Sequence, residues 1–209
     1  TEAIINLLEA RINVLEKSLM NSLSTSIYSD GTGSSGKEVG GLQLLVADAG
    51  TGTVGGINSS TFTFWQNVQT TATSSAFSVA NVQSDMNTMY LSLVRGSDSP
   101  NLIMAGTNAY TAFLGSLQAI QRITSDDMAR SGFTSLQYLN SDVVFDSACN
   151  TNRMYFLNTD YLRLEVAASR DFVPGEAKMS VNQDAMVTPM FWSGNLTCSN
   201  RALQGVIHT

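Results

Sequence analysis

Apolar and polar positions alternate with a helical period at the start of the chain, over residues 1–26. The apolar side chains recur at steps of three and four; they are Ile4, Leu8, Ile12, Leu15, Leu19 and Leu23. This spacing predicts one helix roughly 37 Å long with a single apolar stripe. We expect the helix to lie across a sheet or along an extended body, so that Leu15→Asp would bury an unpaired carboxylate and destabilise the chain severely. A coiled-coil seam is the alternative, but the steps are mostly four instead of alternating between three and four.

A glycine-rich stretch over residues 30–58 follows the helix. It opens with the run Ser-Asp-Gly-Thr-Gly-Ser-Ser-Gly at residues 29–36, which is typical of a helix end and a loop. One short apolar run, residues 42–47, interrupts it and is expected to be a short strand. A loop of this length is usually functional or flexible.

The middle of the chain shows two more helical patterns with a short apolar strand between them. The first covers residues 78–94, with an apolar face made by Val79, Val82, Met86, Met89 and Leu93. Residues 101–105 form a predicted buried strand, and Thr107 or Asn108 caps the next helix. This order predicts an α/β layer.

Beyond Gly132 the pattern changes to short strands separated by turns. The predicted strands cover residues 134–139, 142–146, 153–157, 161–166, 185–192 and 203–208. A turn is expected at residues 171–175, and Pro189 suits a strand edge or a bulge.

Composition adds that the surface carries few charges. Only 13% of the residues are charged, whereas about 25% is typical. Because charged residues are depleted in interface cores, this fits a protein that contacts further copies of itself; a secreted or surface domain rich in hydroxyls is the alternative. The net charge is −6 and the 11 basic residues are spread thinly, which argues against a dedicated nucleic-acid-binding face.

The start of the chain shows no targeting signal. It opens with Thr1-Glu2 inside the helical pattern, without the basic start and apolar stretch of a signal peptide. No apolar run reaches the roughly 18 residues that suggest a membrane span. The missing initiator Met and the abrupt helical start predict a fragment that lacks its N-terminal part.

Two glycine motifs match nucleotide-binding loops in part. Gly31-x-x-x-x-Gly36-Lys37 matches the phosphate-cradling loop up to its lysine. Glu38 stands where a Ser or Thr should bind magnesium, and its carboxylate would repel phosphate. The loop also follows a predicted helix, whereas the motif needs a strand before it and a helix after it. A nucleotide-binding enzyme that uses residues 31–37 is therefore a minor alternative.

The second motif is Gly50-x-Gly52-x-x-Gly55, the dinucleotide fingerprint, which follows the short apolar run. No helical pattern follows it, and Ser75 stands where an acidic residue is expected. A turn-rich loop explains these glycines better.

The residue types that carry most catalysis are scarce. His208 is the single histidine, which excludes His-rich metal sites and argues against Ser-His-Asp or Cys-His triads. Cys149 and Cys198 follow no metal or disulfide spacing and are expected to be free, buried thiols. Asp126 and Asp127 are adjacent, so their side chains point apart and fit a solvated loop better than acid–base work. The sequence predicts no catalytic, metal or cofactor site.

Several phrases of the sequence resemble one family. The long helix is followed by Asp30-Gly31-Thr32-Gly33 and Gly41-Leu42, and the order helix, strand, helix follows over 78–94, 101–105 and 108–117. Residues 182–185 read Asn-Gln-Asp-Ala, and residues 192–201 read Trp-Ser-Gly-Asn-Leu-Thr-Cys-Ser-Asn-Arg. Together these phrases resemble the major capsid proteins of tailed bacteriophages and prophages with the Hong Kong 97-type fold, in a branch similar to the Bordetella phage capsid proteins. The resemblance covers essentially the whole chain.

This resemblance implies an α+β fold with a long spine helix, an antiparallel peripheral sheet and an α/β axial domain. The spine helix and the glycine-rich loop (1–40) and the C-terminal strands (166–209) would form the peripheral domain. Residues 41–165 would form the axial domain, which points to the centre of a pentamer or hexamer. The N-terminal arm and the extended loop that precede the spine helix in this family are missing.

The resemblance also implies a function. The chain would be a major capsid subunit, not an enzyme, that self-assembles into the icosahedral shell around phage double-stranded DNA. Its partners would be further copies of itself, with scaffolding or portal proteins in addition, and it would contact packaged DNA only weakly and no membrane. It would reside in the virion capsid, and in the host bacterial cytoplasm during assembly.

A loop over residues 123–132 supplies the candidate interface residues. In the capsid family the loop at this place reaches the capsomer axis, where copies of it meet. Identical acidic side chains near such an axis need an arginine from a neighbour or screening by solvent. The candidates are Arg122, Asp126, Asp127 and Arg130.

Three other functions remain open. A bacterial nanocompartment shell has the same fold and would differ in its cargo. The nucleotide-binding enzyme would show a nucleotide-dependent shift in melting temperature. An adhesin-like surface module is favoured by the Ser and Thr content and disfavoured by the lack of a signal peptide.

Overall fold

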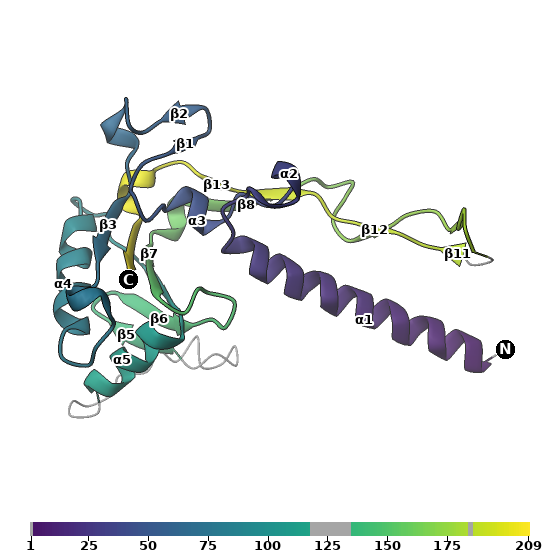
Figure 1. Cartoon of the computed structure of the whole chain (residues 1–209), viewed down its shortest axis with the longest axis horizontal. Helices are drawn as coiled ribbons and strands as arrows, with labels where there is room; N and C mark the ends of the chain where they lie inside the picture. The colour runs from purple at the N-terminus through teal and green to yellow at the C-terminus, as the bar shows by residue number, and fades with distance from the viewer. Residues whose placement is uncertain (1, 118–134, 184–185) are drawn as a thin grey trace.

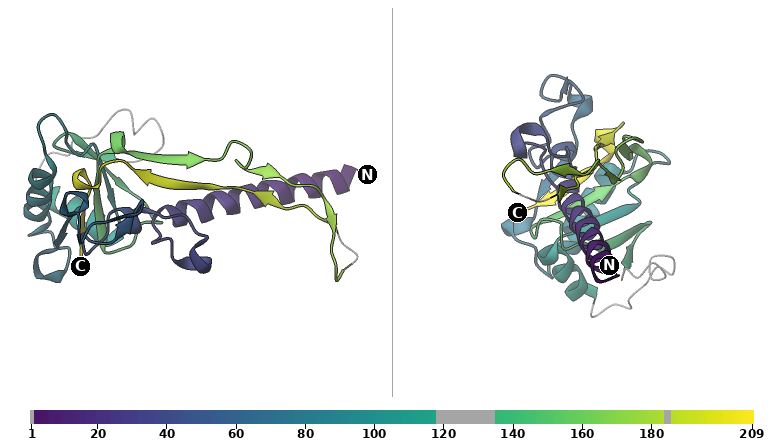
Figure 2. Two further views of the ribbon diagram at one scale, coloured as in Figure 1. Left: turned by 90° about the horizontal axis from the view of Figure 1, so that it is seen from above. Right: turned by 90° about the vertical axis from the view of Figure 1, so that its right-hand side faces the viewer.

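The computed structural model describes residues 2–117, 135–183 and 186–209. They form a body and two extensions, the long helix α1 (Glu2–Ile27) and a β-arm made of residues 162–198. Figures 1 and 2 show both extensions leaving the body in the same direction, with the N-terminus at the far end of α1 and the C-terminus at the body. The predicted first helix is confirmed within one residue at each end.

A six-stranded sheet of mixed orientation forms the centre of the described body, in the order β3-β14-β7-β4-β6-β5. The strands are β3 (Val68–Thr71), β4 (Leu102–Ala105), β5 (Ser135–Tyr138), β6 (Ser141–Phe145), β7 (Arg153–Leu157) and β14 (Gly205–His208). Two pairs, β14 with β3 and β4 with β6, are parallel, and the others are antiparallel. The runs of buried apolar residues in β4, β6 and β7 suit central strands covered on both faces.

Helices cover one face of this sheet and a smaller layer covers the other. The helices α4 (Val82–Leu93) and α5 (Thr107–Leu117) pack Met86, Met89 and Phe113 against Ile103 and Phe156, all fully or almost fully buried. The second layer contains the short helix α3 (Leu42–Leu45) and a cluster of buried residues that includes Tyr28, Leu42, Val46, Tyr155 and Val206.

Residues 42–47, expected to be a short strand, begin with α3 instead, and this prediction is wrong. The backbone turns because the N–H groups of Leu44 and Leu45 both donate to the carbonyl of Gly41, and that of Val46 donates to Leu42. Leu42, Leu45 and Val46 are all buried. The periodicity of this short apolar run fits a helix or a strand, and packing onto the sheet decides that it is helical.

From residue 10 onward, the apolar stripe of α1 is not fully buried within the chain, which corrects the expectation from the sequence. No side chain from residue 10 to residue 27 is buried, and Ile12 and Leu15 are 42% and 39% exposed. The helix leaves the body at its C-terminal end instead of lying across the sheet, as Figure 2 shows. The predicted severe destabilisation by Leu15→Asp therefore loses its basis for the single chain.

The β-arm is a narrow two-stranded ribbon interrupted twice. Its strand pairs are β8 (Leu162–Val166) with β13 (Gly194–Cys198), β9 (Val173–Pro174) with β12 (Met190–Phe191), and β10 (Lys178–Met179) with β11 (Met186–Val187). All three pairs are antiparallel. The expected turn at 171–175 is confirmed only at its start, where the chain bends and Phe172 has a left-handed φ of 52°. Val173 and Pro174 form β9 instead, because Val173 pairs with Phe191 across the ribbon. Pro189 lies between β11 and β12, outside the paired residues.

The last strand belongs to the body. β14 lies between β3 and β7 in the six-stranded sheet, whereas the predicted peripheral domain contained all of residues 166–209 together with the long helix. Val206 and Ile207 are fully buried there. The division of the chain into peripheral and axial domains otherwise stays a prediction.

Candidate assembly surfaces

The first nucleotide-like loop already holds a carboxylate. Ser34 and Ser35 adopt left-handed φ angles of 50° and 62° in the short turn α2 (Gly33–Gly36). The Ser34 hydroxyl donates to Glu38 Oε1 at 3.2 Å. Beside it, Asp30 accepts from the backbone N–H and the hydroxyl of Thr32, and these bonds lower the pKa of Asp30. Two carboxylates on one small loop favour a closed turn over a phosphate cradle.

The second glycine motif forms a hairpin and not a dinucleotide-binding turn. It follows α3 and leads into β1 (Thr53–Val54) and β2 (Ile57–Asn58), which pair antiparallel. Gly55 and Gly56 connect them with φ angles of 61° and 79°, the left-handed pair that a two-residue hairpin turn requires. The fingerprint needs a strand before the glycines and a helix after them, and the chain has the reverse.

The thiols are unreactive by position. Both cysteines are free. Cys149 is buried as expected, whereas Cys198, also expected to be buried, is half-buried. Burial raises the pKa of the Cys149 thiol to about 12 and raises the pKa of Cys198 as well. Both are therefore protonated at neutral pH, and a protonated thiol is a poor nucleophile.

His208 Nε2 lies 3.3 Å from Gln69 Oε1. In the described ranges, no three His, Cys, Asp or Glu residues gather in a way that could hold a metal ion.

Long-range hydrogen bonds hold both extensions to the body. The Tyr28 hydroxyl, just after α1, donates to Asp146 Oδ2 at 2.7 Å. Burial and this bond raise the pKa of Tyr28 above its ordinary range. The N–H of Gly40 donates to Asn195 Oδ1 of the β-arm at 2.8 Å. Residues 28–40, which follow α1, therefore connect the C-terminal end of α1 both to the body and to strand β13 of the β-arm.

Arg201 joins three segments beneath the β-arm. Its side chain is fully buried and donates from Nε to the Leu45 carbonyl at 2.6 Å, from Nη2 to Asn67 Oδ1 at 3.0 Å and from Nη1 to the Trp65 carbonyl at 3.3 Å. Burial lowers the pKa of this guanidinium. The sequence predicted no role for Arg201. The one feature that pointed to it was its position at the end of segment 192–201, which resembles the capsid family.

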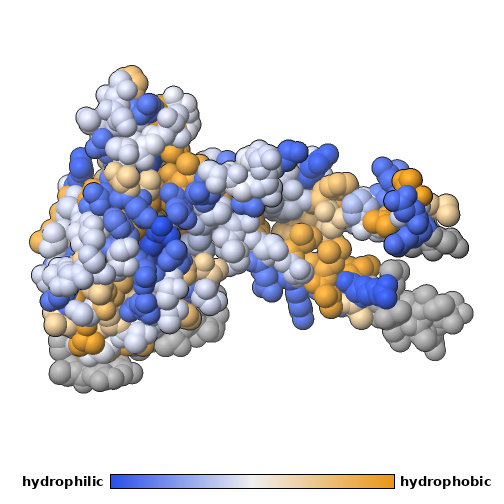
Figure 3. All heavy atoms as spheres, viewed as in Figure 1, coloured by the Kyte–Doolittle hydropathy of each residue, from blue (hydrophilic) through white to orange (hydrophobic). Residues whose placement is uncertain are grey.

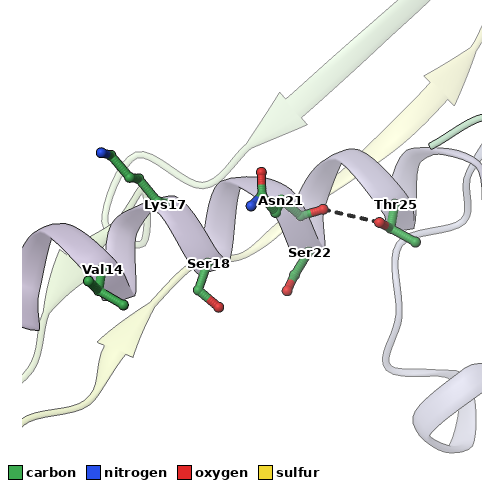
Figure 4. A pocket seen from close by; sticks show the side chains of 6 residues that line it. All are labelled: Val14, Lys17, Ser18, Asn21, Ser22 and Thr25. Atoms are coloured by element: carbon green, nitrogen blue, oxygen red, sulfur yellow. Dashed lines mark hydrogen bonds between the residues drawn. The ribbon is translucent and has the colours of Figure 1, made fainter. Parts of the chain in front are cut away.

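A shallow groove of about 290 Å³ runs between the C-terminal half of α1 and the β-arm. Its apolar lining consists of Leu19, Leu23, Val39, Phe172, Met190 and Trp192. Figure 3 shows apolar surface in this region, between the two extensions. Another side of α1 is mostly polar: Figure 4 shows Lys17, Ser18, Asn21, Ser22 and Thr25 following Val14 along the helix.

Exposed apolar side chains continue to the far end of the β-arm. Val181 is 98% exposed, Met179 71%, Met186 70% and Val187 53%. Single exposed apolar residues are normal on a monomer, but a grouped set marks an interaction surface. With the exposed residues of α1, this set makes both extensions candidate contact surfaces.

The sequence-predicted interface residues cannot be placed among these surfaces. Arg122, Asp126, Asp127 and Arg130 lie outside the described residues, so their role stays a prediction. None of the helices in the part of the chain that the structure describes combines the length and the hydropathy that a membrane span requires.

Comparison with solved structures identifies the fold. The chain is similar to a chain of the cyanophage A-1(L) capsid asymmetric unit, with a TM-score of 0.69 and 17% identity over 97% of this chain and 67% of that one. It is also similar to an E. coli CFT073 prophage protein assigned as a capsid protein, with a TM-score of 0.51 and 7% identity over 80% of this chain and 60% of the other. This chain has a phage capsid fold.

The remaining comparisons add little to this result. The virus-like particle protein of Pyrococcus furiosus aligns with a TM-score of 0.40 and 9% identity over 60% of this chain and 48% of that one, too low to support an argument. No protein-family model matches the chain, and neither does any curated protein. The expected α+β capsid fold is confirmed, and the capsid fold spans body, helix and β-arm alike, because 97% of the chain aligns with the cyanophage protein.

Proposed function

We propose that the chain is a structural shell subunit, the body of a phage or prophage major capsid protein of the Hong Kong 97 type, and not an enzyme. The observation that carries this proposal is the exposed apolar surface of α1 and the β-arm, on a chain with a phage capsid fold. In water such surface favours association, with about 25 cal/mol gained per Å² of apolar area removed from solvent.

The partners of these surfaces would be further copies of the chain, in pentamers and hexamers of an icosahedral shell around double-stranded DNA. Peripheral residues 1–40 and 166–209 would join neighbouring capsomers. Axial residues 41–165 would point to the capsomer centre, where Arg122, Asp126, Asp127 and Arg130 of adjacent copies meet. Repeated use of one interface is how closed symmetric assemblies form.

Other partners would bind more weakly. Scaffolding or portal proteins would contact the shell during assembly. With a net charge of −6, the inner surface would contact packaged DNA weakly and non-specifically. The protein would reside in the virion, and in the host bacterial cytoplasm during assembly.

Two alternatives are less well supported. A bacterial nanocompartment shell of the same fold would carry a cargo enzyme in place of DNA, and no observation on this chain favours it. A nucleotide-binding enzyme that uses residues 31–37 is disfavoured by Glu38, which already accepts a hydrogen bond within that loop. ATP with magnesium is expected to leave the melting temperature unchanged.

Sedimentation velocity and electron microscopy of the purified chain test the proposal. We expect oligomers or shells whose formation is prevented by Leu15→Asp on α1, because the new carboxylate would be desolvated at the contact. Leu91→Asp is the matched control, since Leu91 is an exposed leucine on α4 of the body. A chain that stays monomeric at every concentration would contradict the proposal. Purified shells filled with a protein cargo and free of nucleic acid would favour the nanocompartment.

A further inference from the structure

The two extensions meet at a pair of glycines. The chain leaves the end of α1, makes the glycine-rich turn and comes back, closed by the Ser29 hydroxyl, which donates to the Val39 carbonyl at 2.7 Å. Gly41 then lies against the last turn of α1, and Gly40 lies against strand β13 of the β-arm. Figure 1 shows the roots of α1, α3 and β13 side by side at this place. We call Gly40, Gly41 and Asn195 the junction.

Gly41 contacts the end of α1 with no room for a side chain. A Cβ on Gly41 would overlap the carbonyl oxygen of Ile27 and would lie 2.6 Å from that of Ser26. Both atoms belong to the backbone, so no side chain can turn aside to make space. The φ angle of Gly41 is −84°, which any residue adopts. The contact therefore needs the small size of Gly41, and its distance of closest approach sets the position of the helix end.

Asn195 links the same glycine pair to the β-arm. Its Oδ1 accepts the N–H of Gly40 at 2.8 Å and that of Leu196 at 3.0 Å. Gly40 is buried, and a buried backbone donor that loses its acceptor is costly. Strand β13 pairs with β8 along its whole length. Asn195 is thus held on a well-paired part of the β-arm and passes the direction of that arm to Gly40.

Contacts on both sides of the junction restrict the angle between α1 and the β-arm. The groove described above lies between these two elements, with Leu19 and Leu23 from α1 and Met190 and Trp192 from the β-arm, so the same angle sets its width. Both extensions carry exposed apolar side chains. The relative direction of two contact surfaces on one subunit determines the rotation between neighbouring copies.

We propose that Gly41 and Asn195 are positioning residues of the shell subunit. They set the angle between α1 and the β-arm, and with it the curvature at which neighbouring copies join. The statement about the angle concerns the single chain, whereas the statement about curvature rests on the shell function above. A methyl group at residue 41 would act as a wedge at the root of α1. Arg11 lies roughly 24 Å further along the helix, so a tilt of about 10° would move it by about 4 Å.

Pulsed electron paramagnetic resonance on the whole chain measures this angle. Spin labels are placed at Arg11→Cys on α1 and Lys178→Cys on the β-arm, with Cys198→Ser to remove the half-buried thiol. The labelled chain is diluted into excess unlabelled chain, so that only distances within one chain are read. Gly41→Ala is expected to shift the mean distance by about 4 Å. Asn195→Leu, which removes the acceptor of Gly40, is expected to broaden the distance distribution.

Two matched variants separate positioning from a general loss of stability. Gly36→Ala adds a Cβ that meets nothing within 4 Å, at a left-handed φ of 76°; it should lower stability and leave the distance unchanged. Thr197→Val removes a side-chain hydrogen bond to the Arg163 carbonyl within the same ribbon and should also leave the distance unchanged. Distances that are the same in both junction variants as in the unmodified chain would overturn the proposal. Asn195→Leu changes an exposed residue and keeps the proposal testable if Gly41→Ala does not fold.

Electron microscopy of assembled material tests the curvature. Gly41→Ala is expected to give particles of another diameter or of irregular shape, whereas Gly36→Ala should match the unmodified chain. Particles of unchanged diameter together with a shifted label distance would overturn the link between angle and curvature. An unmodified chain that never assembles would overturn the shell function, and the label distances would then decide on the junction by themselves.

Discussion

The body and the two extensions differ in where their apolar residues find partners. In the body, Met86, Met89, Ile103 and Phe156 have no exposed surface, because sheet and helices enclose them within one chain. Along α1 and the β-arm, some apolar side chains stay open to solvent, from Leu15 at 39% to Val181 at 98% exposed. The body therefore encloses its own core within one chain, whereas these residues of the extensions leave apolar surface open to solvent.

The largest expected effect is a cavity in the body. Phe113→Ala removes a ring that is 1% exposed and packs edge-on against Tyr138. Truncation of a buried phenylalanine typically costs about 3–5 kcal/mol of unfolding free energy. Chemical denaturation should show this loss with circular dichroism as the probe. A loss below about 1 kcal/mol would mean that the body core is not closed as described.

Arg201 tests the junction between body and β-arm. Arg201→Met keeps most of the side-chain volume but leaves the Leu45 and Trp65 carbonyls and Asn67 Oδ1 without their donor. Buried unsatisfied groups cost about 1–3 kcal/mol each, and partial relaxation makes about 2–4 kcal/mol reasonable here. Arg163→Met, at an exposed arginine of β8, is the matched control. Equal stability of the two variants would contradict the role of Arg201.

The thiol of Cys149 predicts how body stability changes in alkali. Its pKa in the folded state is raised to about 12 from 9.0, chiefly by burial. Above pH 9 the unfolded chain loses this proton and the folded chain keeps it, so the contribution is complete below pH 9 and falls as pH rises towards 12. The loss attributable to this group is about 1–3 kcal/mol over that window. Cys149→Ala should flatten the decline in urea titrations across the range, and an unchanged slope would contradict the assignment.

The smallest effect is expected at the long helix. Leu15→Asp changes a side chain that is 39% exposed, so the unfolding free energy of the monomer should change by no more than about 0.5 kcal/mol. Its effect should appear only in assembly. A large loss of monomer stability would mean that the stripe is covered within the chain, as the sequence first suggested, and would remove the difference between body and extensions.

Local patterns predicted the elements whose signal lies within a few residues. The boundaries of α1 followed from apolar steps of three and four, and β4, β6 and β7 followed from short apolar runs between turns. Periodicity survives tertiary folding because it reflects the geometry of the element itself. The expectation that the two glycine motifs bind no nucleotide rests on residue type, since Glu38 and Ser75 are the wrong residues for these motifs, and it stays a prediction.

Long-range contacts decided the rest. β13 has Gly194, Asn195 and Thr197 in its five residues and was not predicted; it is a strand because β8 pairs with it along its whole length. β14 joined the body because a place between β3 and β7 buries Val206 and Ile207, and Arg201 acquired its role only where three segments meet. A helical stripe specifies which residues share a face, but not what covers that face. For α1, the tertiary structure leaves Ile12 and Leu15 exposed, whereas Leu19 and Leu23 share a groove with the β-arm.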